Sequence, residues 1–376
     1  MANEGMVVGK EYTLMAREAV EDVDELPDPI SQADIDRYLV YGEGVTINKK
    51  RAPLRKTGHS PYRKGWKSKR GALSFPFSID VMEVYATAIS AGTTRPLNDD
   101  VWDLLGFLPP TYATAPPETV VGGQALTRVL GSAAFPGVTI KHYIRDEQGN
   151  NRTLWSLVGA KAEGSISGGS AEPLVVAVRT GMAGKNSSIA DTAISLPDLS
   201  YIDTEGDCPL PLVCEGVAIV AMETVEGVPD LYLGEIKNFE FTIGNTISER
   251  RSIRDPGGLA KVQNTAGNYV ELSMEVLHTD TVDWDAYRAM EDNIPLEITF
   301  RFDDSEDPNN RFYIHGFFQL EDIDEGEGEE VHTRTLSFHG LFDESDGWTR
   351  SPATATAGDP GCTAGNSLSV RWETIP

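Results

Sequence analysis

The stretch that decides the fold is RTLWSLVGAKAEGSISGGSAEPLVVAVRTGM, residues 152–182. Apolar residues alternate with polar or small ones over residues 152–167, and a second alternating run covers residues 172–181. This period of two is typical of strands that bury one face. Gly168, Gly169 and Pro173 lie between the runs and favour a turn. The stretch therefore predicts two successive β-strands.

The same alternation recurs along most of the chain. Leu73, Phe75, Phe77 and Ile79 would share one face of a strand, and Pro76, which has no backbone N–H to donate, predicts a sheet edge or a bulge there. Further alternating segments are residues 138–146, 234–244, 269–278, 295–303, 311–322 and 332–342. The sequence therefore predicts a mainly β protein.

Two segments have a helical pattern. Residues 97–108 begin with Asn98 and Asp99 as capping candidates, and residues 281–293 begin with Thr281. Each segment lies between predicted strands, so each predicted helix would flank a sheet.

Similar patterns in the two halves suggest an internal duplication. Residues 75–79 match residues 239–243, both with the pattern Phe-x-Phe-x-Ile, and Trp102 and Trp284 are each followed by Asp. Arg152 and Arg311 each open a strand, and Gly181 and Gly340 each close one, both at an offset of 159 residues. Equal offsets at the two ends of a hairpin favour a repeat of strand, helix and three strands.

This pattern divides the chain as follows. We expect an N-terminal arm (residues 1–70), a first β domain (71–185), a linker with a short hairpin (186–230), a second β domain (231–345) and a C-terminal arm (346–376). The C-terminal arm ends in one more predicted strand, Leu368 to Trp372. That strand would either fold back on its own domain or pair with the sheet edge of a neighbour.

Charge is segregated along the chain, whose formal net charge is −26. Residues 49–70 carry +10 and no acid, which leaves −36 on the other 354 residues. The ten cations are Lys49, Lys50, Arg51, Arg55, Lys56, Arg63, Lys64, Lys67, Lys69 and Arg70. Residues 321–332 hold the opposite concentration, namely Glu321, Asp322, Asp324, Glu325, Glu327, Glu329 and Glu330.

We expect these two segments to be contact surfaces between copies of the chain. The cations, with Tyr62 and Trp66 among them, would also suit nucleic acid. The negative charge of the rest of the chain opposes a polyanion, so an acidic protein surface fits the charge balance better.

No pattern in the sequence nominates a catalytic residue, a metal site or a cofactor. The segment around Gly184 and Lys185 departs from the phosphate-loop pattern at two positions, and residues 303–307 lack calcium-loop spacing. Cys208, Cys214 and Cys362 fit neither a disulfide framework nor a zinc site. The six histidines show no metal spacing, although His315 and His339 would face each other across a predicted hairpin.

Neither a membrane span of about 18 apolar residues nor a signal-peptide pattern is found, so we expect assembly in a cytoplasm. The six tryptophans leave a sugar-binding β-sandwich as an alternative, and the many carboxylates leave a glycoside hydrolase, although no particular pair is nominated.

The hairpin 152–182 resembles the tail tube proteins (major tail proteins) of long-tailed bacteriophages. Shared features are an apolar strand, the run Leu-Val-Gly-Ala-Lys-Ala-Glu-Gly, a Gly-rich turn and a strand closing on Thr-Gly. Residues 235–276 are similar to the family's strand ending in Gly-Asn, followed by an Arg-bearing loop and a further strand. The similarity covers roughly residues 70–345 and departs at Ala162, where the family often has Gly, and in the basic segment.

The resemblance implies duplicated tail-tube-type β-sandwich domains, each with one flanking helix. It also implies a structural virion protein without catalytic activity, whose sheets join side by side into rings that stack into a hollow tube. Two domains per chain predict a trimeric ring with approximate sixfold symmetry, and a hexamer is the alternative. The expected partners are further copies and other phage tail proteins, and DNA would pass through the lumen without specific binding.

Overall fold

The structure is a computed structural model. It describes residues 11–20, 23–26, 37–40, 44–48, 50–51, 54–55, 68–69, 73–85, 87–90, 95–113, 124–131, 137–145, 151–169, 172–183, 185–186, 193–194, 212–221, 236–251, 260–277, 290–304, 306–325, 333–341 and 368–375. Within these ranges the chain is built almost entirely of antiparallel strands, which confirms the predicted mainly β fold.

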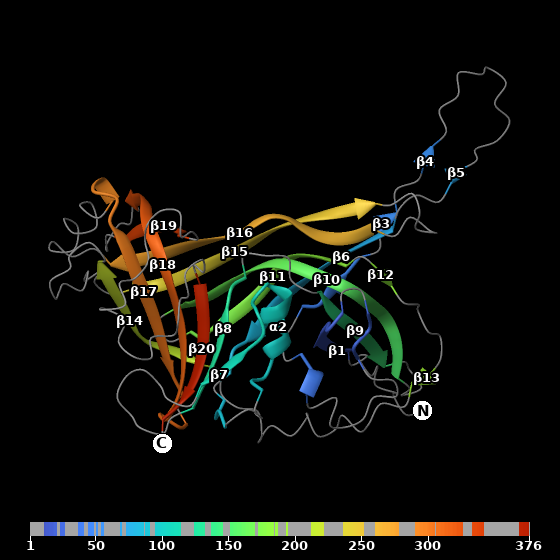
Figure 1. Cartoon of the computed structure of the whole chain (residues 1–376), viewed down its shortest axis with the longest axis horizontal. Coiled ribbons are helices and arrows are strands. Elements are labelled where there is room, and N and C mark those ends of the chain that lie inside the picture. Colours follow the sequence, from blue (N-terminus) through green and yellow to red (C-terminus); the bar gives the residue numbers. More distant parts are fainter. Residues whose placement is uncertain are drawn as a thin grey trace, which may run out of the picture.

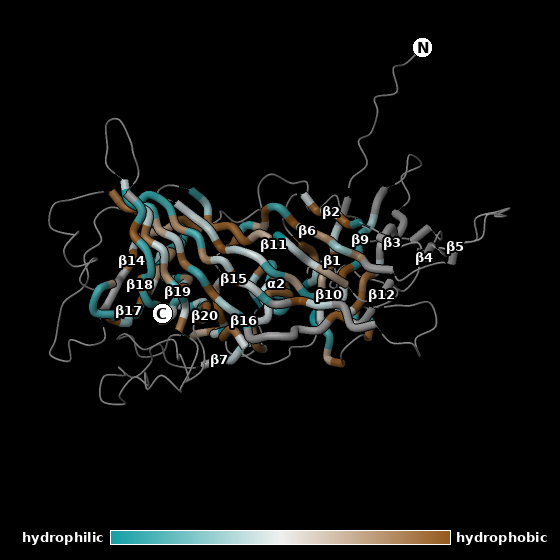
Figure 2. The backbone as a smooth tube through the Cα atoms, turned by 90° about the horizontal axis from the view of Figure 1, so that it is seen from above, coloured by the Kyte–Doolittle hydropathy of each residue, from teal (hydrophilic) through white to brown (hydrophobic). Residues whose placement is uncertain are grey.

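A central antiparallel sheet runs through the middle of the molecule (Figure 1). Its strands, in spatial order, are β6 (Leu73–Glu83), β11 (Val175–Ala183), β10 (Asn151–Gly169), β15 (Ile236–Arg251), β16 (Ala260–Leu277), β19 (Thr333–Gly340) and β18 (Asn310–Glu325). Two short strands, β2 (Thr46–Ile47) and β3 (Lys50–Arg51), lie on the other side of β6. Hydrophilic and hydrophobic residues alternate along these strands, as the sequence predicts (Figure 2).

Two smaller sheets flank the central one. The first contains β1 (Glu11–Arg17), β9 (Val138–Arg145) and β10, with β12 (Lys185–Asn186) and β13 (Ala193–Ile194) also paired to β10. The second contains β14 (Val213–Ala221), β17 (Pro295–Asp303), β18, β20 (Leu368–Thr374), β8 (Gln124–Val129) and β7 (Thr111–Ala113). A separate two-stranded hairpin joins β4 (Leu54–Arg55) and β5 (Ser68–Lys69).

The long strands β10 and β18 each belong to two sheets. β10 pairs with β9 up to Ala160 and with β11 from Lys161 onward. The register shifts before Ala160, where Gly159 has a φ of 71°. The backbone N–H of Gly159 donates to the buried Glu18 carboxylate at 2.6 Å. A glycine is favoured because this φ lies in the left-handed region, where a side chain is strained.

Pairing in the two halves follows the same plan. Ile144 pairs with Arg152 in the β9–β10 hairpin, and Asp303 pairs with Arg311 in the β17–β18 hairpin. Each residue of the second pair lies 159 positions after its counterpart in the first pair. β6 lies next to β11 as β16 lies next to β19. β2 and β3 lie next to β6 as β15 lies next to β16.

This plan corrects one part of the predicted repeat. The strand that corresponds to residues 75–79 is β16, and not residues 239–243 of β15. The Phe-x-Phe-x-Ile pattern occurs in both segments because both bury one face in the core, and it does not define equivalent positions.

The halves are joined by a strand pairing, since Gly164–Gly169 of β10 pairs with Asn238–Ile243 of β15. The predicted domain boundaries stay a prediction. The predicted last strand is present as β20, and it folds back between β18 and β8 of its own chain. Pro76 lies on β6 beside a register shift in the pairing with β11, which fits the expected bulge.

α2 (Asp99–Leu104) packs beneath the central sheet (Figure 1), and all six of its residues are buried. Gly106, with a φ of 95°, ends the helix. Asn98 precedes the helix, but the expected side-chain cap is absent. Its amide instead donates to the Glu83 carbonyl at 3.0 Å and attaches the start of the helix to β6. Of the second predicted helix, residues 281–289 lie outside the described residues.

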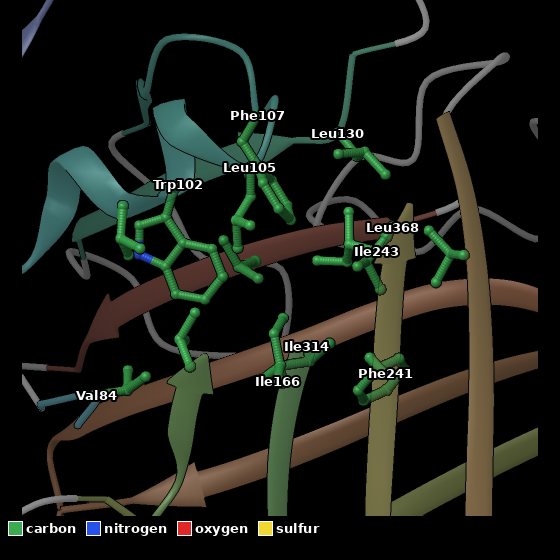
Figure 3. Close-up of a cluster of buried hydrophobic side chains, with 14 of the residues drawn as sticks. Val84, Trp102, Leu105, Phe107, Leu130, Ile166, Phe241, Ile243, Ile314 and Leu368 are labelled. Carbon is green, nitrogen blue, oxygen red and sulfur yellow. The ribbon is translucent and has the colours of Figure 1, made fainter. Parts of the chain in front are cut away.

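Aromatic side chains connect α2 to both halves of the core. Trp102 makes an edge contact with Trp372 at 5.7 Å between ring centroids, and Trp372 contacts Phe312 at 4.8 Å. Figure 3 shows Trp102 of α2, with Leu105 and Phe107 directly after the helix, pointing toward strands of the sheet. Contacts of this geometry add about 0.5–1.5 kcal/mol to the burial of each ring. Among the described residues, no helix is long and apolar enough to cross a membrane.

Replacing Trp372 by alanine should destabilise the protein by about 3–5 kcal/mol, because it opens a cavity beside Trp102 and Phe312. Denaturant unfolding would measure this loss. Val81→Ala, at a position 38% exposed on β6, is the control and should change stability by less than about 0.5 kcal/mol. Equal effects would show that Trp372 does not anchor the core.

Candidate assembly surfaces

The basic segment follows β2 at the outer edge of the central sheet. β3 pairs with the start of β6, through Lys50 with Ser74 and Arg51 with Leu73. β4 and β5 then form a hairpin that projects beyond the body of the molecule (Figure 1). Of the predicted contact residues, Lys50, Arg51, Arg55 and Lys69 therefore lie on strands. Lys49, Lys56, Arg63, Lys64, Lys67 and Arg70 lie outside the described residues.

The acidic segment begins at the end of β18. Glu321, Asp322 and Asp324 are exposed, and Ile323 between them is half-buried against the core. Glu325 is the last residue of β18, and Glu327, Glu329 and Glu330 lie outside the described residues. The exposed acids thus lie on a strand that belongs to the central sheet.

The described parts of the two charged segments lie at opposite ends of the molecule. The strands β4 and β5 lie at one end of the long axis, and β18 and β19 lie at the other, in both views (Figures 1 and 2). The described charges of the two segments therefore do not pair with each other within one chain.

The junction between the halves is held by more than the strand pairing. The buried Asn245 side chain of β15 donates to the Ala162 carbonyl of β10 at 2.6 Å and to the Leu105 carbonyl after α2 at 2.9 Å. Asn245 thus fixes β15 against β10. A Cβ atom on Gly164 would lie 2.4 Å from the Ala177 carbonyl oxygen of β11, so a larger residue would force β10 and β11 apart.

Buried charges hold α2 against the strands. Arg128 of β8 binds both carboxylate oxygens of Asp99, at 2.8 and 2.7 Å, and reaches Asp103 at 3.1 Å. Arg17 at the end of β1 lies 3.5 Å from Asp103, and Arg95 lies 3.5 Å from Asp100. The planar guanidinium of Arg128 suits this two-point binding. Each carboxylate has a cationic partner, so the cluster is explained by a structural role.

Burial raises the pKa of Asp100 from 3.8 to about 7, and Asp99 and Asp103 add to the rise while Arg95 opposes it. Burial also raises the pKa of Asp103, although Arg128 opposes it. A carboxyl group with a raised pKa binds its proton more tightly in the folded state than in the unfolded state. The Asp100 contribution to stability therefore falls as the pH rises from about 4 to 7.

Other predicted sites have structural explanations. His315 does not face His339, because Gln319 pairs with His339; His315 is buried with its Nδ1 2.8 Å from the Thr299 hydroxyl. The carboxylates of Asp304 and Asp307 accept backbone N–H groups of their own turn, as in a solvated turn. Among the described residues, no group of three His, Cys, Asp or Glu side chains is placed to hold a metal ion.

The tryptophans give little support to a sugar site. Trp102 and Trp372 are 1% and 0% exposed, so neither ring is free to stack on a sugar. The structure describes no side chain for Trp66, Trp155, Trp284 or Trp348.

Comparison with known proteins gives a distant similarity to a solved structure. No protein-family model matches the chain, and no curated protein matches it. Among solved structures, the chain is similar to one from the tail of an empty GTA particle computed with helical refinement and C6 symmetry. The TM-score is 0.26 at 14% identity, and the match covers 33% of this chain and 90% of that chain. A likeness this distant establishes neither a shared fold nor a shared role.

The sequence did not point to Asn245 or to the apolar edge residues Val45, Ile47 and Ile323 as contact residues. Asn245 had a local signal, since a Gly-Asn pair interrupts an apolar strand. The edge residues had no local sequence signal, because an apolar residue in a strand gives the same pattern whether or not its strand lies at the edge of a sheet.

The variant Asp100→Asn should remove the pH-dependent loss of stability. Asparagine is neutral at every pH, so the variant should match the wild type near pH 3, exceed it increasingly as the pH rises from about 4 to 7, and keep the full gain near pH 8. The gain should be at most about 4 kcal/mol, which corresponds to a pKa rise from 3.8 to about 7. Denaturant unfolding at several pH values would measure it. With Asp80→Asn, an exposed control, the pH profile should keep its wild-type shape; a parallel profile for Asp100→Asn would contradict the expectation.

Proposed function

We propose that this chain is a structural protein of a bacteriophage tail, which associates with copies of itself into rings that stack into a hollow tube. Its role is architectural, without a catalytic centre, a cofactor or a bound metal. The sequence resemblance to tail tube proteins supports the class. The opposite placement of the basic and acidic segments supports contacts between copies.

The observation that carries the proposal is the repeated strand plan. Two similar sets of strands lie side by side in one antiparallel sheet, joined by the β10–β15 pairing. A surface that adds one unit to the next in the same orientation generates a closed ring when the rotation between units closes. Three chains would supply six units, and six chains remain the alternative.

Stacking of rings is assigned to the hairpins. The hairpin of β15 and β16 reaches the same end of the molecule as β3 and the projecting β4–β5 hairpin (Figure 1). In a ring, these hairpins would all project from the same face, along the ring axis. The cations of the projecting hairpin, such as Arg55 and Lys69, would then contact acidic surfaces of the adjacent ring, and such contacts weaken as salt rises.

The exposed face of the central sheet suits a passage for DNA. Arg179 pairs with Glu240 there, and Lys237 pairs with Glu275 at 2.8 Å. Asp80 and Glu271 are exposed on the same sheet and add negative charge. A lumen lined by this face would repel phosphates within about one Debye length, roughly 8 Å at physiological salt. DNA would therefore pass through the lumen without specific binding. The expected location of a protein with this role is the virion tail.

Electron microscopy of the purified protein, with rotational averaging of end-on views and light scattering for mass, tests the proposal. We expect annuli with six lobes, alone or stacked, containing three chains. Six chains per annulus would keep the function but replace the trimer by a hexamer. A monomer at every protein and salt concentration would contradict self-assembly of the isolated chain.

Stacking can be tested separately from ring formation. Replacing Arg63, Lys64, Lys67 and Lys69 by Glu should leave single annuli but prevent tubes, because the reversed charges would face acidic surfaces. The matched control exchanges Lys and Arg at the same four positions and keeps the charge, so it should still stack. Tubes of normal length from the Glu variant, seen by negative-stain microscopy, would refute the role of the basic segment.

A further inference from the structure

Among the described strands, β18 lacks a partner along one side of its last residues. On one side of β18, β17 pairs with the residues from Arg311 to Gln319. Beyond Gln319, no described strand continues on that side, although β19 still pairs on the other side up to Glu325. On β10 the corresponding side is filled, because β15 follows β9 and pairs with Gly164–Gly169.

The opposite end of the sheet carries the counterpart of β15. β2 and β3 pair with β6, and no described strand pairs with their outer side. They stand beside β6 as β15 stands beside β16. The first half thus presents an outermost strand that corresponds to β15, which fills the position on β10. In the second half, no described strand fills the corresponding position on β18.

We propose that β2 and β3 of one copy pair antiparallel with the Leu320–Glu325 edge of β18 in the next copy, which repeats the β10–β15 junction between chains. This pairing rests on the proposed self-association of the chain, and it specifies which strands make the contact between two copies. A strand edge with unpaired N–H and C=O groups is a template for pairing with a further strand. We infer that a second copy of the chain supplies the additional strand, because the β10–β15 junction within this chain already contains the same kind of pairing.

Apolar residues on the two edges fit this pairing. Ile323 on β18, and Val45 and Ile47 at β2, are all half-buried hydrophobic side chains that pack against the core. At the internal junction the corresponding inward positions are filled by pairs such as Ile166 with Phe241, both fully buried. Pairing of the edges would therefore bring Ile323 against Val45 or Ile47 and remove all three from water.

Charge favours the antiparallel direction of this pairing and favours the β2–β3 edge as the partner of the β18 edge. In the antiparallel arrangement, the end of the edge that holds Lys50 and Arg51 of β3 approaches the start of the β18 edge, where Glu321 and Asp322 lie. Two β18 edges would instead place acids against acids, which is unfavourable for paired strands. The contact is therefore head to tail, as ring closure requires.

Disulfide cross-linking tests the contact directly. Ile47→Cys and Ile323→Cys are placed in one chain in which Cys208, Cys214 and Cys362 are serine, and Val45→Cys replaces Ile47→Cys in a second version. Opposite residues of antiparallel strands lie about 4.5–5.5 Å apart at Cα, which a disulfide can span. Oxidation should give a ladder of linked chains on non-reducing gels in at least one version. The control pair Val20→Cys and Glu306→Cys, exposed and away from both edges, should give none.

Microscopy of the same samples separates this inference from the proposed function. Annuli together with a ladder support both. Annuli without a ladder in either version overturn the edge pairing and leave the tube function standing. A ladder without annuli supports the edge pairing and counts against rings, and the absence of both overturns both.

Reversal of charge gives an independent test. Glu321→Lys with Asp322→Lys, or Lys50→Glu with Arg51→Glu, should each reduce the ladder at least tenfold, and all four together should restore it. Glu291→Lys with Glu306→Lys changes two exposed acids elsewhere and should leave the ladder unchanged. An undiminished ladder in the single-edge variants, or no recovery in the fourfold variant, would overturn the role assigned to charge.

Discussion

The fold depends on two strands that must each serve two sheets. A strand can leave one sheet for another only where its ladder is interrupted, and β10 does so at Gly159, whose amide is bound by Glu18 instead of by a neighbouring strand. The other strands follow from this change of partners. The first part of β10 pairs with strands of a flanking sheet, and the second part pairs with strands of the central sheet. β18 repeats the arrangement with its own register shift at Leu320.

The space between the sheets is filled by α2, where packing and charge have different roles. Trp102, Leu105 and Phe107 contribute apolar burial, which stabilises by about 25 cal/mol per Å² removed from water. The carboxylates of Asp99, Asp100 and Asp103 lose hydration on burial, and Arg128, Arg17 and Arg95 offset part of that cost. A buried ion network of this kind adds little net stability but penalises wrong packing, because a misplaced helix would leave a charge without its partner.

Much of the fold could be predicted from local patterns, while the contact surfaces could not. Alternation identified the strands, and the Trp102 helix was marked by a helical pattern that begins with the capping candidates Asn98 and Asp99. The equal offset of 159 placed the two hairpins correctly. The match of residues 75–79 to 239–243 failed because an apolar strand pattern reports burial and says nothing about which strand lies next to it. For the same reason no local feature marked Ile323 as an edge residue, since an edge is defined by a missing neighbour that lies far away in the sequence.

The position of β20 has a consequence for how the chain reaches its folded state. β20 lies between β8 and β18, and the N–H of Leu130 bonds the carbonyl of Leu368 across more than two hundred residues of chain. On a ribosome, β8 and β18 are both made before the strand that joins them, so Trp102 lacks one of its ring partners until then. Contacts of such long sequence separation slow folding, and synthesis of β20 is the event that completes the core. An incompletely synthesised chain would therefore remain only partly folded, which would limit its entry into an assembly.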